Sequence, residues 1–197
     1  MYKKQLKIQK IVCLLVLAAS VVVFLYSLGI MTDLYDSLYF TIRDPNKPDR
    51  NPVAGALIYY DMQGFNQKFL QFGIGLILCA VLLFLTNTHS RRRYYRSNVI
   101  AVLLNLAFNV YVAIWAHAQI VAYKAQYLLV DFEELKTFSE RRHTYYTEST
   151  FWFDVHTAVF AFAILANVLL IANMIWKFQL MNQEKQLINA GKKEAAA

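Results

Sequence analysis

The chain has 197 residues, of which 58% are apolar and only 17% are charged, and its formal net charge is +7. A water-soluble globule of this size would carry roughly a quarter charged residues, so the composition is typical of a membrane protein. The abundance of apolar residues excludes a disordered chain, and the presence of only 2 cysteines excludes a disulfide-stapled secreted module.

Four stretches of the chain contain no Asp, Glu, Lys or Arg and are long enough to cross a bilayer. About 20 helical residues, rising 1.5 Å each, span about 30 Å of hydrocarbon. These stretches do not alternate between polar and apolar residues, which excludes a transmembrane β-barrel. The sequence therefore predicts an all-α integral membrane protein built as a four-helix bundle. The transmembrane helices are expected at residues 11–32, 69–90, 97–123 and 155–176.

The lysine-rich segment 1–10 precedes the first apolar stretch and is similar to the start of a secretory signal peptide. The apolar stretch is longer than the roughly 7 to 15 residues of a signal core, and no small-residue cleavage site follows Leu28. We expect this stretch to be retained as a membrane anchor.

The distribution of charge predicts the orientation in the membrane. Lys and Arg outnumber Asp and Glu in segments 1–10, 91–96 and 177–197, whereas acids outnumber cations in the connections 33–68 and 124–154. Loops rich in Lys and Arg stay on the cytoplasmic side. Both termini and the turn 91–96 are therefore expected in the cytoplasm, and the two longer connections are expected to be extracytoplasmic loops.

The cytoplasmic turn 91–96 is strongly basic. A tight basic turn at a membrane surface is expected to contact anionic lipid headgroups, so no nucleic-acid partner is inferred. The residues assigned to this lipid contact are Arg91, Arg92, Arg93 and Arg96.

Each predicted outer loop combines a turn-rich part with an amphipathic part. All three prolines of the chain lie within residues 43–52, which predicts a loop crest there, preceded by a short amphipathic helix over residues 33–42. In the second loop, Phe132, Leu135 and Phe138 recur among acidic residues in a similar way. Neither loop contains cysteine, so packing, interfacial aromatic residues or another subunit must hold both loops in place.

Aromatic residues gather toward the predicted outer side of the membrane. They favour headgroup anchoring, while a protein–protein surface and stacking against a sugar or a lipid headgroup remain alternatives. The residues concerned are Tyr26, Tyr35, Tyr39, Tyr59, Tyr60, Tyr123, Tyr127, Tyr145, Tyr146, Phe151, Trp152 and Phe153.

Small and amide side chains within the spans predict helix–helix contacts. Small residues let helix backbones approach, and amides can bond across helices. No Asp, Glu, Lys or Arg lies deep in any span, which argues against an autonomous transporter or channel. The helix-packing residues are expected to be Asn98, Asn105, Asn109, Asn167, Gly75 and Cys79.

Two histidines and a carboxylate form the most specific candidate for a functional site. His117, Asp154 and His156 fall near the same ends of the third and fourth spans, and this residue set could bind a metal ion. The two imidazoles could also flank a haem iron. Solvated interfacial imidazoles are the simpler interpretation. No nucleophilic triad or phosphate loop accompanies the site, so the chain is not expected to be an enzyme, and no cofactor is assigned.

After the fourth span, residues 177–190 keep apolar side chains among polar ones without a helix breaker until Gly191. This pattern predicts either a cytoplasmic extension of the fourth helix or an interfacial helix, with Gly191 as its end. Taken together, these features favour a non-catalytic accessory or structural subunit of a larger plasma-membrane complex, such as a transport complex. The expected partners are membrane lipid and other integral membrane subunits, and the expected location is a bacterial plasma membrane. A redox protein that binds metal or haem through His117 and His156, and a four-helix sensor, remain as alternatives.

Overall fold

The computed structural model describes residues 2–32, 53–88, 95–143 and 145–194. These residues form six helices and no strand. Four are long: α1 (Tyr2–Thr32), α4 (Ile58–Asn87), α5 (Tyr95–Tyr127) and α8 (His156–Glu194). Two are short: α6 (Phe132–Arg142) and α7 (Phe151–Asp154).

All four long helices contain a segment long and apolar enough to cross a membrane. Over the described residues this confirms the predicted all-α architecture with four helices able to span a membrane, whereas the orientation of the loops and termini stays a prediction. The candidate spans are Lys4–Met31, Ile58–Asn87, Asn98–Tyr127 and Phe151–Gly191.

The helices extend beyond the charge-free stretches of the sequence. α4 begins at Ile58 rather than near residue 69, and α1 begins at Tyr2. Charged side chains are costly in hydrocarbon but not in a helix that continues into headgroups or water. A charge-free stretch therefore marks the hydrocarbon layer and not the ends of a helix.

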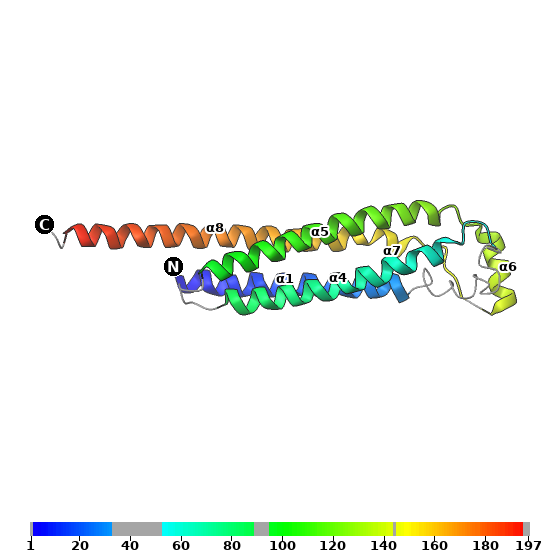
Figure 1. Ribbon diagram of the computed structural model, residues 1–197, viewed down its shortest axis with the longest axis horizontal. Coiled ribbons are helices and arrows are strands. Elements are labelled where there is room, and N and C mark those ends of the chain that lie inside the picture. The colour runs from blue at the N-terminus through cyan, green and yellow to red at the C-terminus, as the bar shows by residue number, and fades with distance from the viewer. Residues whose placement is uncertain (1, 33–52, 89–94, 144, 195–197) are drawn as a thin grey trace.

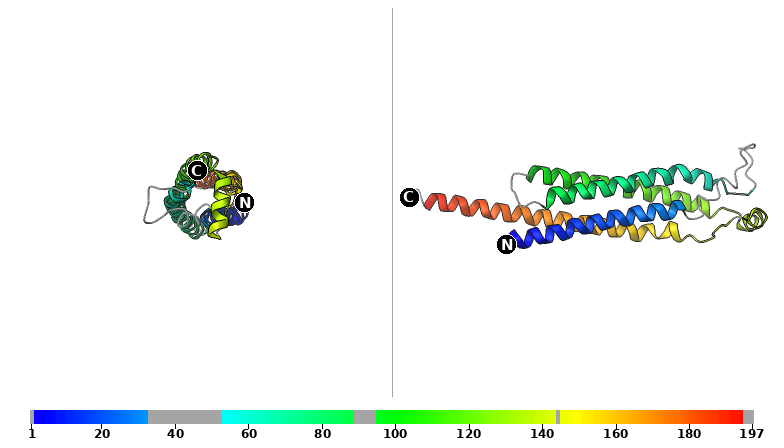
Figure 2. Two further views of the ribbon diagram at one scale, coloured as in Figure 1. Left: turned by 90° about the vertical axis from the view of Figure 1, so that its right-hand side faces the viewer. Right: turned by 90° about the horizontal axis from the view of Figure 1, so that it is seen from below.

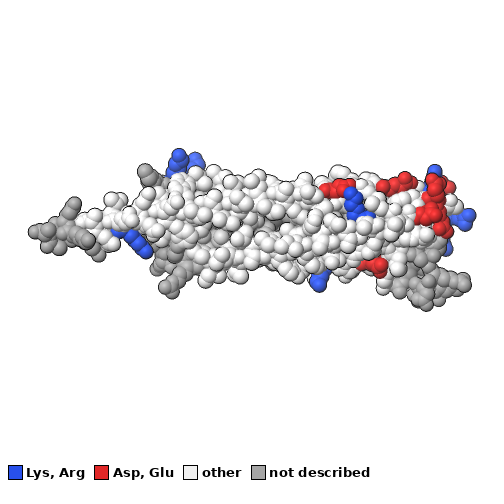
Figure 3. Space-filling view, turned by 90° about the horizontal axis from the view of Figure 1, so that it is seen from above, with Lys and Arg blue, Asp and Glu red and all other residues white. Residues whose placement is uncertain are grey.

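The long helices are arranged around a common axis (Figure 2, left). α1 packs against α4 and α8, and α5 packs against α4 and, less extensively, against α8. Both chain ends lie at one end of the bundle and α6 lies at the other (Figure 1). The side of the bundle seen in Figure 3 is almost free of charge along its middle, and acidic residues gather toward the α6 end.

Helix α6 is amphipathic and has capping residues at both ends. The Asp131 side chain accepts a hydrogen bond from the Glu134 backbone N–H (2.9 Å), and His143 closes the helix in a left-handed conformation (φ 54°). Leu135 is buried. The Asp131 N–H also donates to the Ala54 carbonyl (3.0 Å), so α6 is tied to the segment that precedes α4.

The aromatic residues do not all act as membrane anchors. Tyr26, Tyr59, Tyr127 and Phe153 are buried inside the protein, where Tyr127 packs against Tyr59 and Phe153. Headgroup anchoring is therefore wrong for these four, because their rings fill the core between the helices. Tyr35 and Tyr39, like the predicted amphipathic helix and the proline-rich crest of the first outer loop, lie outside the described residues.

Candidate functional site: a histidine pair near the α6 end

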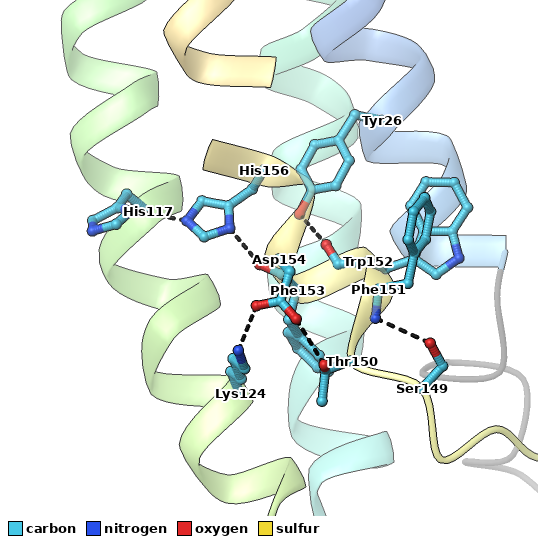
Figure 4. Close-up of polar contacts among 10 residues, drawn as sticks. All are labelled: Tyr26, His117, Lys124, Ser149, Thr150, Phe151, Trp152, Phe153, Asp154 and His156. Atoms are coloured by element: carbon cyan, nitrogen blue, oxygen red, sulfur yellow. Dashed lines mark hydrogen bonds and ion pairs between the residues drawn. The ribbon is translucent and has the colours of Figure 1, made fainter. Parts of the chain in front are cut away.

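The break between α7 and α8 places the candidate site residues. Thr150 precedes α7, and its carbonyl accepts hydrogen bonds from the N–H groups of Phe153 (2.9 Å) and Asp154 (3.0 Å). The Thr150 hydroxyl donates to Asp154 Oδ2 (2.7 Å). This turn orients Asp154 toward α5 and places His156 on the first turn of α8, as Figure 4 shows.

His117 of α5 and His156 of α8 are in direct contact. His117 Nδ1 lies 2.9 Å from His156 Nε2, and the ring centroids are 5.1 Å apart. His156 is only 6% exposed, whereas the His117 ring lies on the exposed side of α5. This geometry agrees with the prediction that the two histidines lie near the same ends of the third and fourth spans.

The backbone determines which nitrogen carries each proton. His156 Nδ1 contacts the Phe153 carbonyl, which can only accept a hydrogen bond, so this nitrogen must be the N–H donor. In the neutral ring, His156 Nε2 is then an acceptor, and His117 Nδ1 must donate to it. His117 Nε2 is left as the free acceptor.

The carboxylate of Asp154 is occupied by other partners. It forms an ion pair with Lys124 of α5 and accepts the hydrogen bond from Thr150. Both members of the ion pair are substantially exposed, so it contributes little to stability. It connects α5 to the end of α7 beside the histidine pair.

The geometry distinguishes between the two metal hypotheses. Metal–imidazole bonds are about 2 Å long, so two histidines on opposite faces of a haem would hold their nitrogens about 4 Å apart. The observed 2.9 Å separation is too short for such a haem, whereas one ion could be held by His117 Nδ1 and His156 Nε2 if it replaced the proton that they share. Among the residues that the structure describes, no three His, Cys, Asp or Glu side chains are grouped to hold a metal ion. The set His117, Asp154 and His156 therefore stays a prediction, with the two imidazoles in place.

The predicted helix-packing amides meet between α5 and α8. Asn105 Nδ2 donates to Asn167 Oδ1 (3.1 Å), and both side chains are buried. Asn109 donates to the Asn105 carbonyl (2.8 Å) and Asn167 to the Ala163 carbonyl (2.8 Å). The bonds of Asn109 and Asn167 to the preceding turn of their own helices fix the orientation of these amides. The hydrogen bond from Asn105 to Asn167 connects α5 to α8.

A second amide cluster at the end that carries the termini was not expected from the sequence. Gln9 of α1 donates to the Asn87 carbonyl (2.7 Å) and side-chain oxygen (3.1 Å) on α4, and Asn87 donates to the Asn98 carbonyl (3.4 Å) on α5. Gln5 donates to Gln9 (2.8 Å). Gln5 and Gln9 are spaced by four residues and continue the buried face of Val12 and Val16, which is the signal that could have revealed them.

The other predicted residues have different surroundings. A Cβ atom at Gly75 would lie 2.9 Å from the Phe108 ring, so this glycine makes room for an aromatic ring of α5. Cys79 is partly buried on the same helix. Arg91, Arg92 and Arg93 lie outside the described residues, and Arg96 belongs to the first turn of α5.

No protein-family model, no curated protein and no solved structure matches the chain. Its function must therefore be inferred from its own residues.

Proposed function

We propose that the chain is a non-catalytic accessory or structural subunit of a larger assembly in a plasma membrane, such as a transport complex. One observation supports this most: α8 continues well beyond the bundle, past the start of α1 (Figure 1). Leu187 and Ile188 on this extension are 74% and 45% exposed. They offer an apolar surface that nothing in the described part of the chain covers.

The extension is an unusual place for exposed apolar side chains. Glu184 and Lys185 lie on the same segment, so hydrocarbon is not its natural surroundings. The membrane-spanning part of α8 nucleates the helix, which explains why the extension is helical. Exposure of the Leu187 and Ile188 side chains to water is nevertheless unfavourable in free energy. A helix or groove of another protein is the surface that would bury them.

Within the bilayer, α5 and α8 present large apolar residues outward. This surface suits both lipid and other integral membrane subunits, the two partners that we propose. The most exposed of these residues are Ile100, Leu103, Leu104, Ile114, Ile164, Leu165, Val168 and Ile175.

Site-specific photocrosslinking in native membranes tests the proposal. A photoreactive phenylalanine analogue at position 187 or 188 is expected to give a discrete crosslinked product with a second protein. The matched controls are positions 186 and 189, which are also exposed but lie on the opposite face of the helix. Equal labelling at all four positions, or none at 187 and 188 in a protein that purifies as a stable monomer, would contradict the proposal.

The histidine pair supports a second candidate function, a redox protein that binds a metal through His117 and His156. The supporting observation is that Phe153 holds the Nδ1–H of His156, as backbone carbonyls do for metal-ligating histidines. Metal analysis and an absorbance spectrum of the purified protein test it. His117→Ala and His156→Ala should each remove the bound metal, whereas His143→Asn, at the exposed end of α6, should retain it. Unchanged metal content in all three variants would contradict the proposed metal-binding function.

A further inference from the structure

We infer that the hollow beside α6 binds a neutral, polyhydroxylated ligand, that is, a sugar unit. The cavity measures about 450 Å³, within the roughly 300 to 1,000 Å³ typical of small-molecule sites. Its walls come from the last turns of α6 and the segment that follows. The lining residues are Lys136, Ser139, Glu140, His143, Tyr145 and Tyr146. This site is separate from both the α8 extension and the histidine pair.

Ser139 gives the first argument for a ligand. It lines the cavity, is only 2% exposed, and its hydroxyl has no hydrogen-bond partner among the residues that the structure describes. Serine within a helix commonly bonds to a backbone carbonyl of the preceding turn, and a buried hydroxyl without a partner is costly. A ligand hydroxyl, which can both donate and accept, would satisfy it.

The charges of the lining residues indicate a neutral ligand. Lys136 can only donate hydrogen bonds, and the Glu140 carboxylate can only accept them. An anion would be repelled by Glu140 and a cation by Lys136, so neither ion matches both side chains. A hydroxyl group can pair with either one, and a sugar presents several hydroxyls at once.

The two tyrosines add an aromatic wall. Tyr145 is 82% exposed, so its ring is open to a ligand in the cavity. Tyrosine combines a flat apolar face with a hydroxyl, the combination that suits the apolar face and hydroxyl rim of a sugar ring. Partial burial, the carboxylate of Glu148 and the hydrogen bond that the Tyr146 hydroxyl donates to it (3.3 Å), together with Glu133 and Glu140, raise the pKa of Tyr146. The phenol oxygen can therefore accept a hydrogen bond from a ligand hydroxyl.

Binding can be measured by saturation-transfer NMR on the full chain in lipid nanodiscs, prepared without sugar-based detergents. The probes are glucose, galactose and N-acetylglucosamine, with inorganic phosphate and tetramethylammonium as charged comparators. At least one sugar should bind saturably, and neither ion should. A second arm adds glucosyl diacylglycerol to the nanodisc: displacement of free glucose identifies a glycolipid as the source, and no displacement identifies a soluble sugar.

Three variants locate the site. Ser139→Ala, Glu140→Gln and Tyr145→Ala should each weaken sugar binding about tenfold, the loss expected when one ligand contact is removed. Their matched controls are Thr137→Ala on another face of α6, Glu184→Gln on the α8 extension and Tyr111→Ala on α5. Ser139→Ala should not lower stability, because its hydroxyl makes no bond within the protein. Absence of sugar binding, binding of either ion in place of sugar, or equal losses in the controls would overturn the inference.

Discussion

The interface between α1 and α4 and the interface between α5 and α8 hold the bundle together in different ways. Along α1 and α4 the backbones approach closely, because a Cβ atom at Gly73 would lie 3.1 Å from Cα and 3.4 Å from Cβ of Phe24. The Gln9–Asn87 hydrogen bonds close this interface at one end. The interface between α1 and α4 thus combines close helix packing with hydrogen bonds at one end.

Between α5 and α8, packing is looser and polar pairs bridge the helices. An apolar groove of about 230 Å³ separates them, lined by Ala113 and Val110 on one side and Ala163 and Ile164 on the other. The contacts that cross this interface include the Asn105–Asn167 bond and the histidine pair. Lipid or another subunit would have to fill the groove to give the close packing found at the first interface.

In a bilayer, lipid chains are as apolar as leucine, so helices associate through close packing and hydrogen bonds and gain little from the hydrophobic effect. The first interface uses close packing, and the second uses individual polar contacts. Substitutions at the first interface should therefore disturb the whole bundle, while those at the second should have smaller, separable effects.

The largest effect is expected at Gly73. Gly73→Leu should lower the free energy of unfolding by about 3 kcal/mol, because the new side chain would have to displace the backbone of α1 near Phe24. Unfolding in mixed micelles with increasing denaturing detergent measures this change.

Gly64→Leu is the matched control on the same helix, because a Cβ atom at Gly64 would meet no atom within 4 Å. Both substitutions gain helix propensity equally, so the difference between them isolates packing. A Gly73 variant as stable as the Gly64 variant would show that α1 and α4 do not approach closely at this point.

Much of this architecture could be predicted from the sequence. Charge-free stretches located the four spans, since a charge in hydrocarbon costs far more than any local preference. The proximity of His117 and His156 followed from their positions near the same ends of two spans, whereas the amides were predicted as packing residues without the pairing of Asn105 with Asn167. The helix that begins at Phe132 followed from the spacing of its apolar residues.

Other features depend on tertiary packing that a linear pattern does not contain. The sequence does not distinguish an interfacial tyrosine from one in the core, so Tyr59 and Tyr127 were misassigned as membrane anchors. Gly191 was expected to stop the last helix, but α8 runs through it to Glu194, because a single glycine weakens a helix by only about 1 kcal/mol. Of the two alternatives for residues 177–190, the structure agrees with the extension, because α8 continues in line with the bundle (Figure 1).

A smaller effect is expected from the amide pair. Asn105→Ala and Asn167→Ala, combined in a double-mutant cycle, should give a coupling free energy of about 0.6 to 1.7 kcal/mol, the range found for hydrogen bonds between membrane helices. The single variants also lose bonds to their own helices, and the cycle subtracts those losses. Unfolding in the same micelles measures all four proteins. A coupling free energy of zero would mean that the groove between α5 and α8 stays wide and that the two amides do not meet.

The smallest effect is expected from the Lys124–Asp154 ion pair, which joins the ends of α5 and α7 in water-accessible surroundings. Lys124→Met should change the unfolding midpoint only at low ionic strength, because salt screens exposed charges within about 10 Å at 0.1 M. Lys185→Met, at an exposed position on the α8 extension, is the control for removing one positive charge. A loss of stability that persists in concentrated salt would show that Lys124 contributes through burial of its aliphatic stem. In that case the ends of α5 and α7 would be packed more tightly than the groove between α5 and α8, and the contrast between the two interfaces would be confined to the middle of the bundle.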